Sequence, residues 1–274
     1  MSTSGDDSAG GAAPIGAEPA ISTEAAIAIV LEHAQRGIHY PDALRGKLPL
    51  AQAYRVDLGI LSHLEALGER HVGWKVGVTA RAMQEQVGVR EPVFGFLLES
   101  GARRSGDTLR LSDLVRPDNE NELCLTLGLD LQGPGVTEEA AGAAIATVAP
   151  AFEIIERRGV FSEIALSVAD NIQQRAFVTG AAVAYDPDRL DLAAVALDLS
   201  LDGVHQERAY GREVMGHPVR SIAWLANKLS EFGLGLKAGQ RIMSGSFTRQ
   251  YPVETALEAV AEFAPVGTVR VRFA

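Results

Sequence analysis

Leucine occupies every second position from 123 to 131 in the middle of this 274-residue chain. Successive side chains of a β-strand point to opposite faces, so residues two apart share a face. An amphipathic helix would instead repeat its apolar residues at spacings of three and four. The alternation therefore predicts a half-buried strand over residues 123–131, and with it a sheet that has an apolar face.

Helical and strand patterns surround this segment without the regular rhythm of a doubly wound fold. Apolar spacings of three and four predict helices over residues 23–37, 51–67, 79–87, 137–149 and 218–232. Alternation predicts further strands over residues 71–78, 151–155, 197–201, 240–244 and 268–273, with a hairpin turn at Asp202-Gly203. We expect a single α+β domain over residues 22–274, helical over 22–70 and rich in mixed β-structure over 71–274.

The first residues differ in composition from the rest. Residues 1–21 are rich in Gly, Ala, Pro and Ser and nearly free of large apolar side chains. Such a segment cannot bury enough apolar surface to offset the entropy of ordering it. We predict a disordered tail over residues 1–21.

Charge and cysteine content exclude several classes of protein. The chain has 25 Lys and Arg against 35 Asp and Glu, a net charge of −10, which disfavours binding to nucleic acid or anionic membranes. The single Cys124 can form neither an internal disulfide nor a thiolate zinc site. No secretory pattern is visible, and the early apolar run at residues 25–31 is far shorter than the ~20 residues of a membrane helix. We expect a cytoplasmic protein whose partner is a small molecule or a protein.

Three glutamates form the most informative polar pattern. Glu120 and Glu122 lie two apart at the start of the leucine strand, so they share the face opposite the leucines. Glu153 lies among apolar residues in AFEIIE, where an unpartnered carboxylate is costly. Carboxylates without His or Cys suit Mg²⁺ or Mn²⁺ rather than zinc. The alternative for the Glu120/Glu122 pair alone is a solvated strand end.

Lys75 is the second candidate. Its neighbours two residues away are Gly73 and Gly77, so its face of the strand carries no other side chain and is open to a ligand. A lysine among apolar residues can serve as an acid or base. Alternatively, Lys75 extends to solvent from a sheet edge.

Weaker motifs remain. Ser244-Gly245-Ser246 follows a strand and either offers backbone N–H groups to a carboxylate or makes a plain turn. A hydrolytic triad of Asp170, His217 and Ser246 lacks the G-x-S-x-G elbow of such enzymes.

Several segments, in this order along the chain, carry a family resemblance: GWKVGVTARAMQEQVGVREPVFGFLL, the E-x-E at 120–122, APAFEIIERR, VADN at 168–171 and GHPVRSIAWLANKLSEFGLGLKAGQRIMSGS. From about residue 51 to the C-terminus the chain resembles the 2-oxopent-4-enoate hydratase / 4-oxalocrotonate decarboxylase group of the fumarylacetoacetate hydrolase-like superfamily. The resemblance implies a mixed β-sheet roll with flanking helices, a bound Mg²⁺ or Mn²⁺, homo-oligomers, and substrates derived from the cleavage of aromatic rings.

The resemblance also implies roles for individual residues. Glu120, Glu122 and Glu153 match the metal-binding carboxylates, and Lys75 and Asp170 match catalytic positions. Substrate-binding positions are matched by Phe94, Leu98, Arg158, Asn171, Ser244 and Ser246. The chain departs from the family pattern at Val93, where an Asp is usual, at Asp57, where a Gln is usual, and around residues 254–259.

The resemblance implies a metal-dependent hydratase that converts a 2-hydroxy-2,4-dienoate into a 4-hydroxy-2-oxo acid. Two alternatives stay open. One is decarboxylation of a 2-oxo-3-enedioate with the same ligands. The other is a non-catalytic subunit that stabilises a partner of the same fold, in a hydratase–decarboxylase complex.

Overall fold

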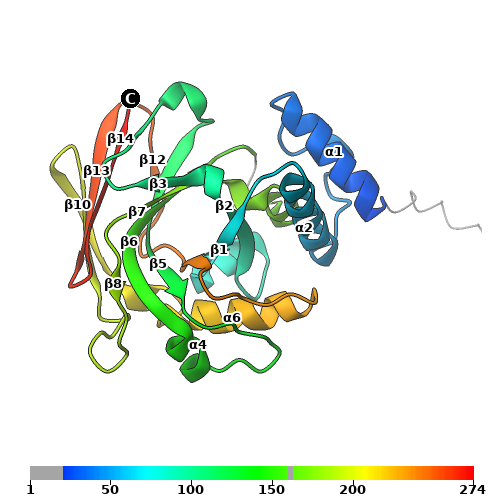
Figure 1. Ribbon diagram of the computed structural model, residues 1–274. Coiled ribbons are helices and arrows are strands. Elements are labelled where there is room, and N and C mark those ends of the chain that lie inside the picture. Colours follow the sequence, from blue (N-terminus) through cyan, green and yellow to red (C-terminus); the bar gives the residue numbers. More distant parts are fainter. Residues whose placement is uncertain (1–20, 160–162) are drawn as a thin grey trace, which may run out of the picture.

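The computed structural model describes residues 21–159 and 163–274. In Figure 1 a strongly curved sheet forms the centre, a second sheet (β10, β13, β14) lies at its left, and helices α1 and α2 lie at its right. The expected α+β fold, a mixed β-roll with flanking helices, is confirmed. The predicted tail lies outside the described residues except for Ile21, which packs against the core and accepts a hydrogen bond from Gln52.

The described residues contain the following helices: α1 (Thr23–Gln35), α2 (Leu50–Ala66), α3 (Arg81–Val87), α4 (Glu138–Ala144), α5 (Ile164–Ala169) and α6 (Val219–Ser230). The central sheet contains β1 (His71–Gly77), β2 (Val93–Leu98), β3 (Ala102–Arg104), β5 (Pro117–Leu127), β6 (Ile145–Glu156), β7 (Gln174–Thr179), β8 (Val183–Ala184), β11 (Arg241–Met243) and β12 (Tyr251–Pro252). The second sheet contains β4 (Thr108–Leu109), β9 (Ala196–Leu201), β10 (Val204–Tyr210), β13 (Leu257–Ala264) and β14 (Gly267–Phe273). No helix within the described ranges is long and apolar enough to cross a membrane.

The central sheet curls into a roll because its two edges are joined by the chain. The strand order is β2-β1-β11-β5-β6-β7-β3, and β2 continues through one 3₁₀ turn, Glu99–Gly101, directly into β3. β2, at one end of this order, therefore comes close to β7, near the other end. The roll has an outer face that packs on helices and an inner face that is closed off from most solvent.

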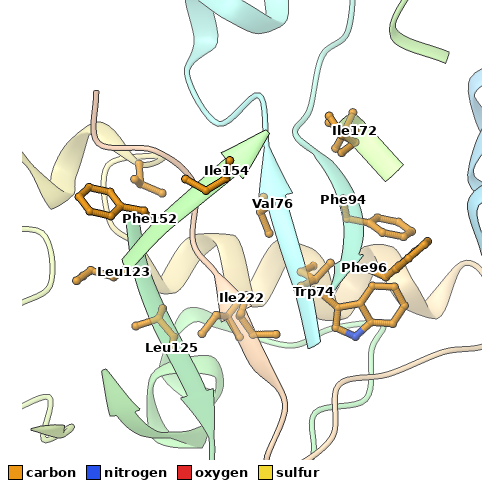
Figure 2. Packing of buried hydrophobic residues seen from close by; sticks show 14 of the residues in the cluster. Trp74, Val76, Phe94, Phe96, Leu123, Leu125, Phe152, Ile154, Ile172 and Ile222 are labelled. Atoms are coloured by element: carbon orange, nitrogen blue, oxygen red, sulfur yellow. The ribbon is translucent and has the colours of Figure 1, made fainter. Parts of the chain in front are cut away.

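The outer face carries the main hydrophobic core. Trp74 and Val76 on β1, Phe94 and Phe96 on β2, and Leu123 and Leu125 on β5 are all buried there. Figure 2 shows these side chains with Ile222, which projects from α6. Helix α6 follows Pro218, whose φ of −57° suits the first turn of a helix. These contacts fix the direction of β1, β2 and β5, and so aim their other faces inward.

The inner face is lined by a row of paired residues. Lys75 pairs with Gly95 on one side and Met243 on the other, and Met243 pairs with Cys124. A small apolar cluster fills the interior, consisting of Leu97, Cys124, Ala149, Ala151, Phe177 and Met243. Polar side chains on this face therefore lie at the ends of the roll.

The leucine strand begins earlier and ends sooner than its pattern predicts. β5 starts at Pro117 and stops at Leu127, and Leu129 is exposed. Leu131 makes an isolated bridge to Leu236. The strand is also buried on both faces rather than one, because the sheet curls around its second face. The leucine pattern marks the outer face correctly but gives no sign of this closure.

The helix predicted over residues 137–149 is wrong beyond Ala144. Ile145, Thr147 and Val148 are β-branched residues that favour strands, and β6 pairs with β5 along almost its full length. Pro150 lies inside β6 opposite Leu123 rather than ending a helix. Strands β2 and β7 were not predicted, because their sequences lack clean alternation between apolar and polar residues. Strand β13 was also missed, although its buried and exposed residues alternate.

A close approach between β1 and β11 requires glycine at position 73. A Cβ atom at Gly73 would lie 1.8 Å from the backbone oxygen of Arg241, and the φ of Gly73 is +155°. Gly73 therefore lets the parallel pair β1–β11 form and sets the position of Lys75, two residues further on.

We predict that Gly73→Ala lowers the free energy of unfolding by about 3 kcal/mol or more, because backbone atoms must move apart. Urea denaturation measures the change. The matched control is Gly142→Ala, whose new Cβ meets only Val219 at 3.8 Å, within helix α4. This control gains about 0.5–1 kcal/mol, since alanine is the better helix former. Equal unfolding midpoints for the two variants would contradict the assignment.

Candidate metal centre and active site

Three glutamates converge at one mouth of the roll. Glu120 pairs with Glu153 across β5 and β6, and Glu122 lies two residues along β5 on the same inner face. One carboxylate oxygen from each of the three lies within 4.8 Å of the others. Glu122 and Glu153 are buried, while Glu120 is partly exposed. The geometry therefore brings the three predicted carboxylates together.

The loop after β11 supports this cluster. The backbone N–H of Gly245 donates to Glu122 Oε2 at 2.8 Å, and the side chain of Gln250 donates to Glu120 Oε1 at 3.0 Å. Gly245 has a φ of +107°, and a Cβ there would lie 2.5 Å from Thr79. The Ser244–Ser246 segment thus offers a backbone N–H to a carboxylate, which is the first of the two interpretations given for its sequence, the other being a plain turn.

Lys75 lies beside the carboxylates inside the roll. Its Nζ is 3.4 Å from Glu153 Oε1, and both side chains are buried. Burial alone opposes the charged form of the lysine, but attraction to Glu153, Glu120 and Glu122 outweighs it, so the pKa of Lys75 is raised above its ordinary value. Lys75 does not extend to solvent, so the sheet-edge alternative for it is wrong.

The protein groups around the carboxylates do not supply enough positive charge to balance them. Burial raises the pKa of Glu153 to about 7, although Lys75 opposes the shift. Burial and repulsion from Glu153 and Glu120 raise the pKa of Glu122 well above its ordinary value. Within the described residues, neither carboxylate oxygen of Glu153 accepts a hydrogen bond. A hard divalent cation with oxygen ligands fits this donor set.

A hollow of about 100 Å³ opens onto the cluster. Its wall includes Glu120, Glu122 and Ser246, together with Thr248, Arg249 and Gln250 from the same loop and residues 76–80 and 83. Thr248 and Asn121 share a hydrogen bond of 2.7 Å, which ties the loop to β5. Thr248, Arg249 and Gln250 were not among the predicted site residues, because nothing in TRQ separates a site loop from any polar loop.

A strained turn closes the other side of Lys75. Asn171, Ile172 and Gln173 all have positive φ, 52°, 39° and 63°, a conformation that non-glycine residues rarely adopt. The Asn171 side chain accepts from the N–H of Phe96 and donates to its carbonyl oxygen, so it pairs the free edge of β2. The predicted substrate-binding Asn171 therefore has its amide engaged in holding β2.

Arg158 and Asp170 form a clamp away from the hollow. Arg158 Nε donates to Asp170 Oδ2 at 2.7 Å, and its Nη1 donates to Glu156 Oε2 at 3.0 Å. The buried guanidinium of Arg158 is therefore paired with two carboxylates. Neither Arg158 nor Asp170 lines the hollow beside the carboxylates.

Two predicted substrate-binding residues point the other way. Phe94 stacks on Tyr54 with ring centroids 4.4 Å apart, in the outer core. Leu98 alternates onto the same outer face of β2. Both side chains therefore lie in the outer core, because Gly95 and not Phe94 pairs with Lys75 on the inner face. Ser244 is buried, with its backbone N–H bonded to Leu123, whereas Ser246 does line the hollow.

Together, the β-roll and its carboxylate cluster form a site whose donor set suits a hard divalent cation beside a lysine. The model of the "Fumarylacetoacetate (FAA) hydrolase C-terminal" family matches residues 52–274. The chain belongs to this family.

Named relatives carry two activities. The chain is 38% identical over 231 residues to the 2-hydroxyhexa-2,4-dienoate hydratase of Comamonas testosteroni, covering 83% of this chain and 87% of the relative. It is 33% identical over 258 residues to the 4-oxalocrotonate decarboxylase of Pseudomonas sp. (strain CF600), covering 90% and 96%. Among solved structures, the 4-oxalocrotonate decarboxylase from Pseudomonas putida G7, complexed with magnesium and adipate, superposes with a TM-score of 0.86 at 30% identity, covering 92% of this chain and 97% of that one.

The raised pKa of Glu153 predicts how Mg²⁺ stabilises the protein at different pH. Without metal, the folded state holds a proton on Glu153 between about pH 4.5 and about 7, so its contribution to stability falls as pH rises through that window. A cation binds the deprotonated form and reverses this loss. We expect saturating Mg²⁺ to raise Tm by about 5–10 °C at pH 8, and by much less at pH 5.5.

Differential scanning fluorimetry measures these shifts. Glu153→Gln is expected to abolish the Mg²⁺-induced shift at pH 8, whereas Glu139→Gln, an exposed residue of α4, retains it. Shifts of equal size at pH 5.5 and pH 8 would contradict this assignment.

Proposed function

We propose that the protein is a divalent-metal-dependent lyase that adds water to a 2-hydroxy-2,4-dienoate, giving a 4-hydroxy-2-oxo acid. The observation that carries the proposal is the cluster of Glu120, Glu122 and Glu153, two of them buried, with Lys75 beside it. The hydratase and decarboxylase names of the relatives support a lyase. The magnesium in the superposed decarboxylase supports Mg²⁺, with Mn²⁺ as the other ion that this donor set suits.

The three glutamates would hold the cation, and Glu120 and Glu122 also line the hollow in which a substrate would bind. When bound, the ion supplies positive charge that polarises a 2-oxo acid and offsets the negative charge developing on its oxygen. Water then adds to the carbon conjugated with the ketone.

Lys75 performs the proton transfer in this proposal. Its Nζ lies inside the roll at the same mouth as the carboxylates, and Gly77 clears the strand face beside it. The glutamates keep its ammonium group charged. Lys75 donates a proton to a carbon atom of the dienol in the forward reaction and accepts that proton in the reverse reaction. Ser246 and Arg249 on the loop wall orient the polar ends of the substrate.

A second candidate is decarboxylation of a 2-oxo-3-enedioate, in which loss of CO₂ replaces addition of water. The observation in its favour is the TM-score of 0.86 to a 4-oxalocrotonate decarboxylase. Both reactions develop negative charge at the same oxygen and use the same ligands, so the cluster serves either.

We also propose that the protein acts in the cytoplasm as a homo-oligomer. Its substrates would be small dienoates from the breakdown of aromatic rings, and it would associate with a partner of the same fold where one is present. A non-catalytic stabilising subunit is the remaining alternative. That alternative gains if Glu120→Ala and Lys75→Ala leave a reconstituted complex fully active.

The test supplies purified protein and Mg²⁺ with 2-hydroxypenta-2,4-dienoate and, separately, with 2-oxo-3-hexenedioate. We expect loss of the dienol absorbance and formation of a 4-hydroxy-2-oxo acid from the first compound. Glu122→Gln should lower kcat/KM by about 100-fold or more, because it removes charge from the cation site. Glu139→Gln should match the unaltered protein. Release of CO₂ from the second compound without hydration of the first would favour the decarboxylase.

A further inference from the structure

A second, larger hollow opens at the other end of the roll. Its volume is about 470 Å³, and among the described residues none lines both this hollow and the one at the carboxylate cluster. On the inner face of β5, Glu120 and Glu122 are followed by Cys124 and Thr126, and the last two line the second hollow. Cys124 belongs to the apolar cluster of the roll interior, so this cluster separates the two hollows. The proposed function leaves the second hollow without a role.

Two arginines line this hollow from different walls. Arg241 on β11 is two residues from Met243, and Arg104 on β3 is two residues from Ala102. Met243 and Ala102 both pack in the interior cluster, so both arginines lie on the inner face, one step closer to the mouth. Strands β5, β6 and β7 lie between β11 and β3 in the sheet. The two guanidinium groups therefore reach the hollow from separate sides.

The positive charge on β3 is not balanced by the protein. Arg104 is exposed, and in the part of the chain that the structure describes neither Arg104 nor Arg103 forms an ion pair. Asp107, which also lines the hollow, accepts a hydrogen bond from the backbone N–H of Arg104 at 2.8 Å. Arg103 lies at the rim, where its Nη1 donates to the carbonyl oxygens of Ser100 and Ala102. Both guanidinium groups are thus open to an added anion.

Arg241 on the other wall is held in place and keeps donors for a ligand. Its Nη2 lies 4.0 Å from Glu99 Oε2, and the same oxygen lies 2.8 Å from Arg70 Nη2. Glu99 is therefore neutralised mainly by Arg70. The guanidinium carbon of Arg241 is 5.6 Å from the centre of the Phe177 ring, and 34% of its side chain is exposed. This partial burial strengthens the attraction of Arg241 for an anion.

The uncharged lining has a polar part and an apolar part. Thr126 and Thr179 supply hydroxyl groups, whereas Cys124 and Ala149 are buried and apolar. The planar guanidinium fork matches the oxygens of a carboxylate or a phosphate. The volume falls within the roughly 300–1,000 Å³ that is typical of sites for small organic molecules. The lining therefore suits a ligand with an apolar body and one acid group.

We propose that this hollow is a second binding site, which takes a small organic anion. The acid group, a carboxylate or a phosphate, lies between Arg104 and Arg241, and the apolar body rests against Cys124 and Ala149. The site carries an excess of arginine in a chain whose net charge is −10, so the attraction is local to this mouth. It does not depend on the cation or on the proposed lyase activity.

The test measures binding of three probes by saturation-transfer NMR titration, in EDTA and at low salt. Butyrate and butyl phosphate carry the same body with the two possible acid groups, and 1-butanol carries the body without an acid. EDTA removes divalent cations, so the carboxylate cluster cannot hold the probes through a metal. Thermal denaturation of each variant checks that it remains folded.

We expect one or both anions to bind the unaltered protein, with 1-butanol binding much more weakly. The tighter of the two anions identifies the acid group. Arg104→Gln and Arg241→Gln should each raise the Kd of that anion about fivefold or more, since each removes a charged donor. If Arg241→Gln lowers Tm, Arg104→Gln still decides, because its side chain is exposed.

Two variants serve as controls. Arg189→Gln removes an arginine whose side chain is 85% exposed and lies away from the hollow, and Glu122→Gln alters the metal-site cluster. Both should bind the anion with unchanged Kd. Absence of binding, equal binding of 1-butanol, or an unchanged Kd in Arg104→Gln would overturn the inference. So would a loss of binding in Glu122→Gln, because that result places the anion at the other mouth.

Discussion

Three carboxylates gathered at one mouth of the rolled sheet, two of them buried, are the constraint on which the rest of this structure depends. Like charges this close repel each other and resist burial, so the fold must supply compensating charge. Lys75 and the N–H of Gly245 supply part of it. A divalent cation held by the three glutamates would supply the remainder, which would account for such an unfavourable cluster in this roll.

The same constraint accounts for the glycines around the site. Gly73 lets β11 approach β1, Gly245 lets the loop after β11 reach Glu122, and Gly95 leaves room for the turn at Asn171. A Cβ at Gly73 would meet the backbone of Arg241, one at Gly245 the side chain of Thr79, and one at Gly95 the side chain of Asn171. The strained turn at residues 171–173 fits the same pattern, because its conformation directs Asn171 onto the edge of β2 and Ile172 toward Lys75. The site is thus positioned by close approach at these glycines together with side-chain hydrogen bonds from Asn171 and Gln250.

Local sequence patterns anticipated the glutamate cluster better than the pocket around it. Alternation places Glu120 and Glu122 on one face whatever the fold, and burial of Glu153 follows from its apolar neighbours. The outer-core position of Phe94 and Leu98 could not be predicted, because β2 is apolar throughout and its sequence does not say which face each side chain occupies. The closure of the sheet, the length of β6 and the role of Gln250 depend on contacts between distant segments, which no local pattern contains.

Anomalous diffraction from crystals grown with Mn²⁺ and pyruvate would locate the cation. We predict one strong anomalous peak per chain within coordination distance of Glu120, Glu122 and Glu153, with pyruvate beside it on the side of the hollow. A peak at any other group of carboxylates, with none between these three, would contradict it.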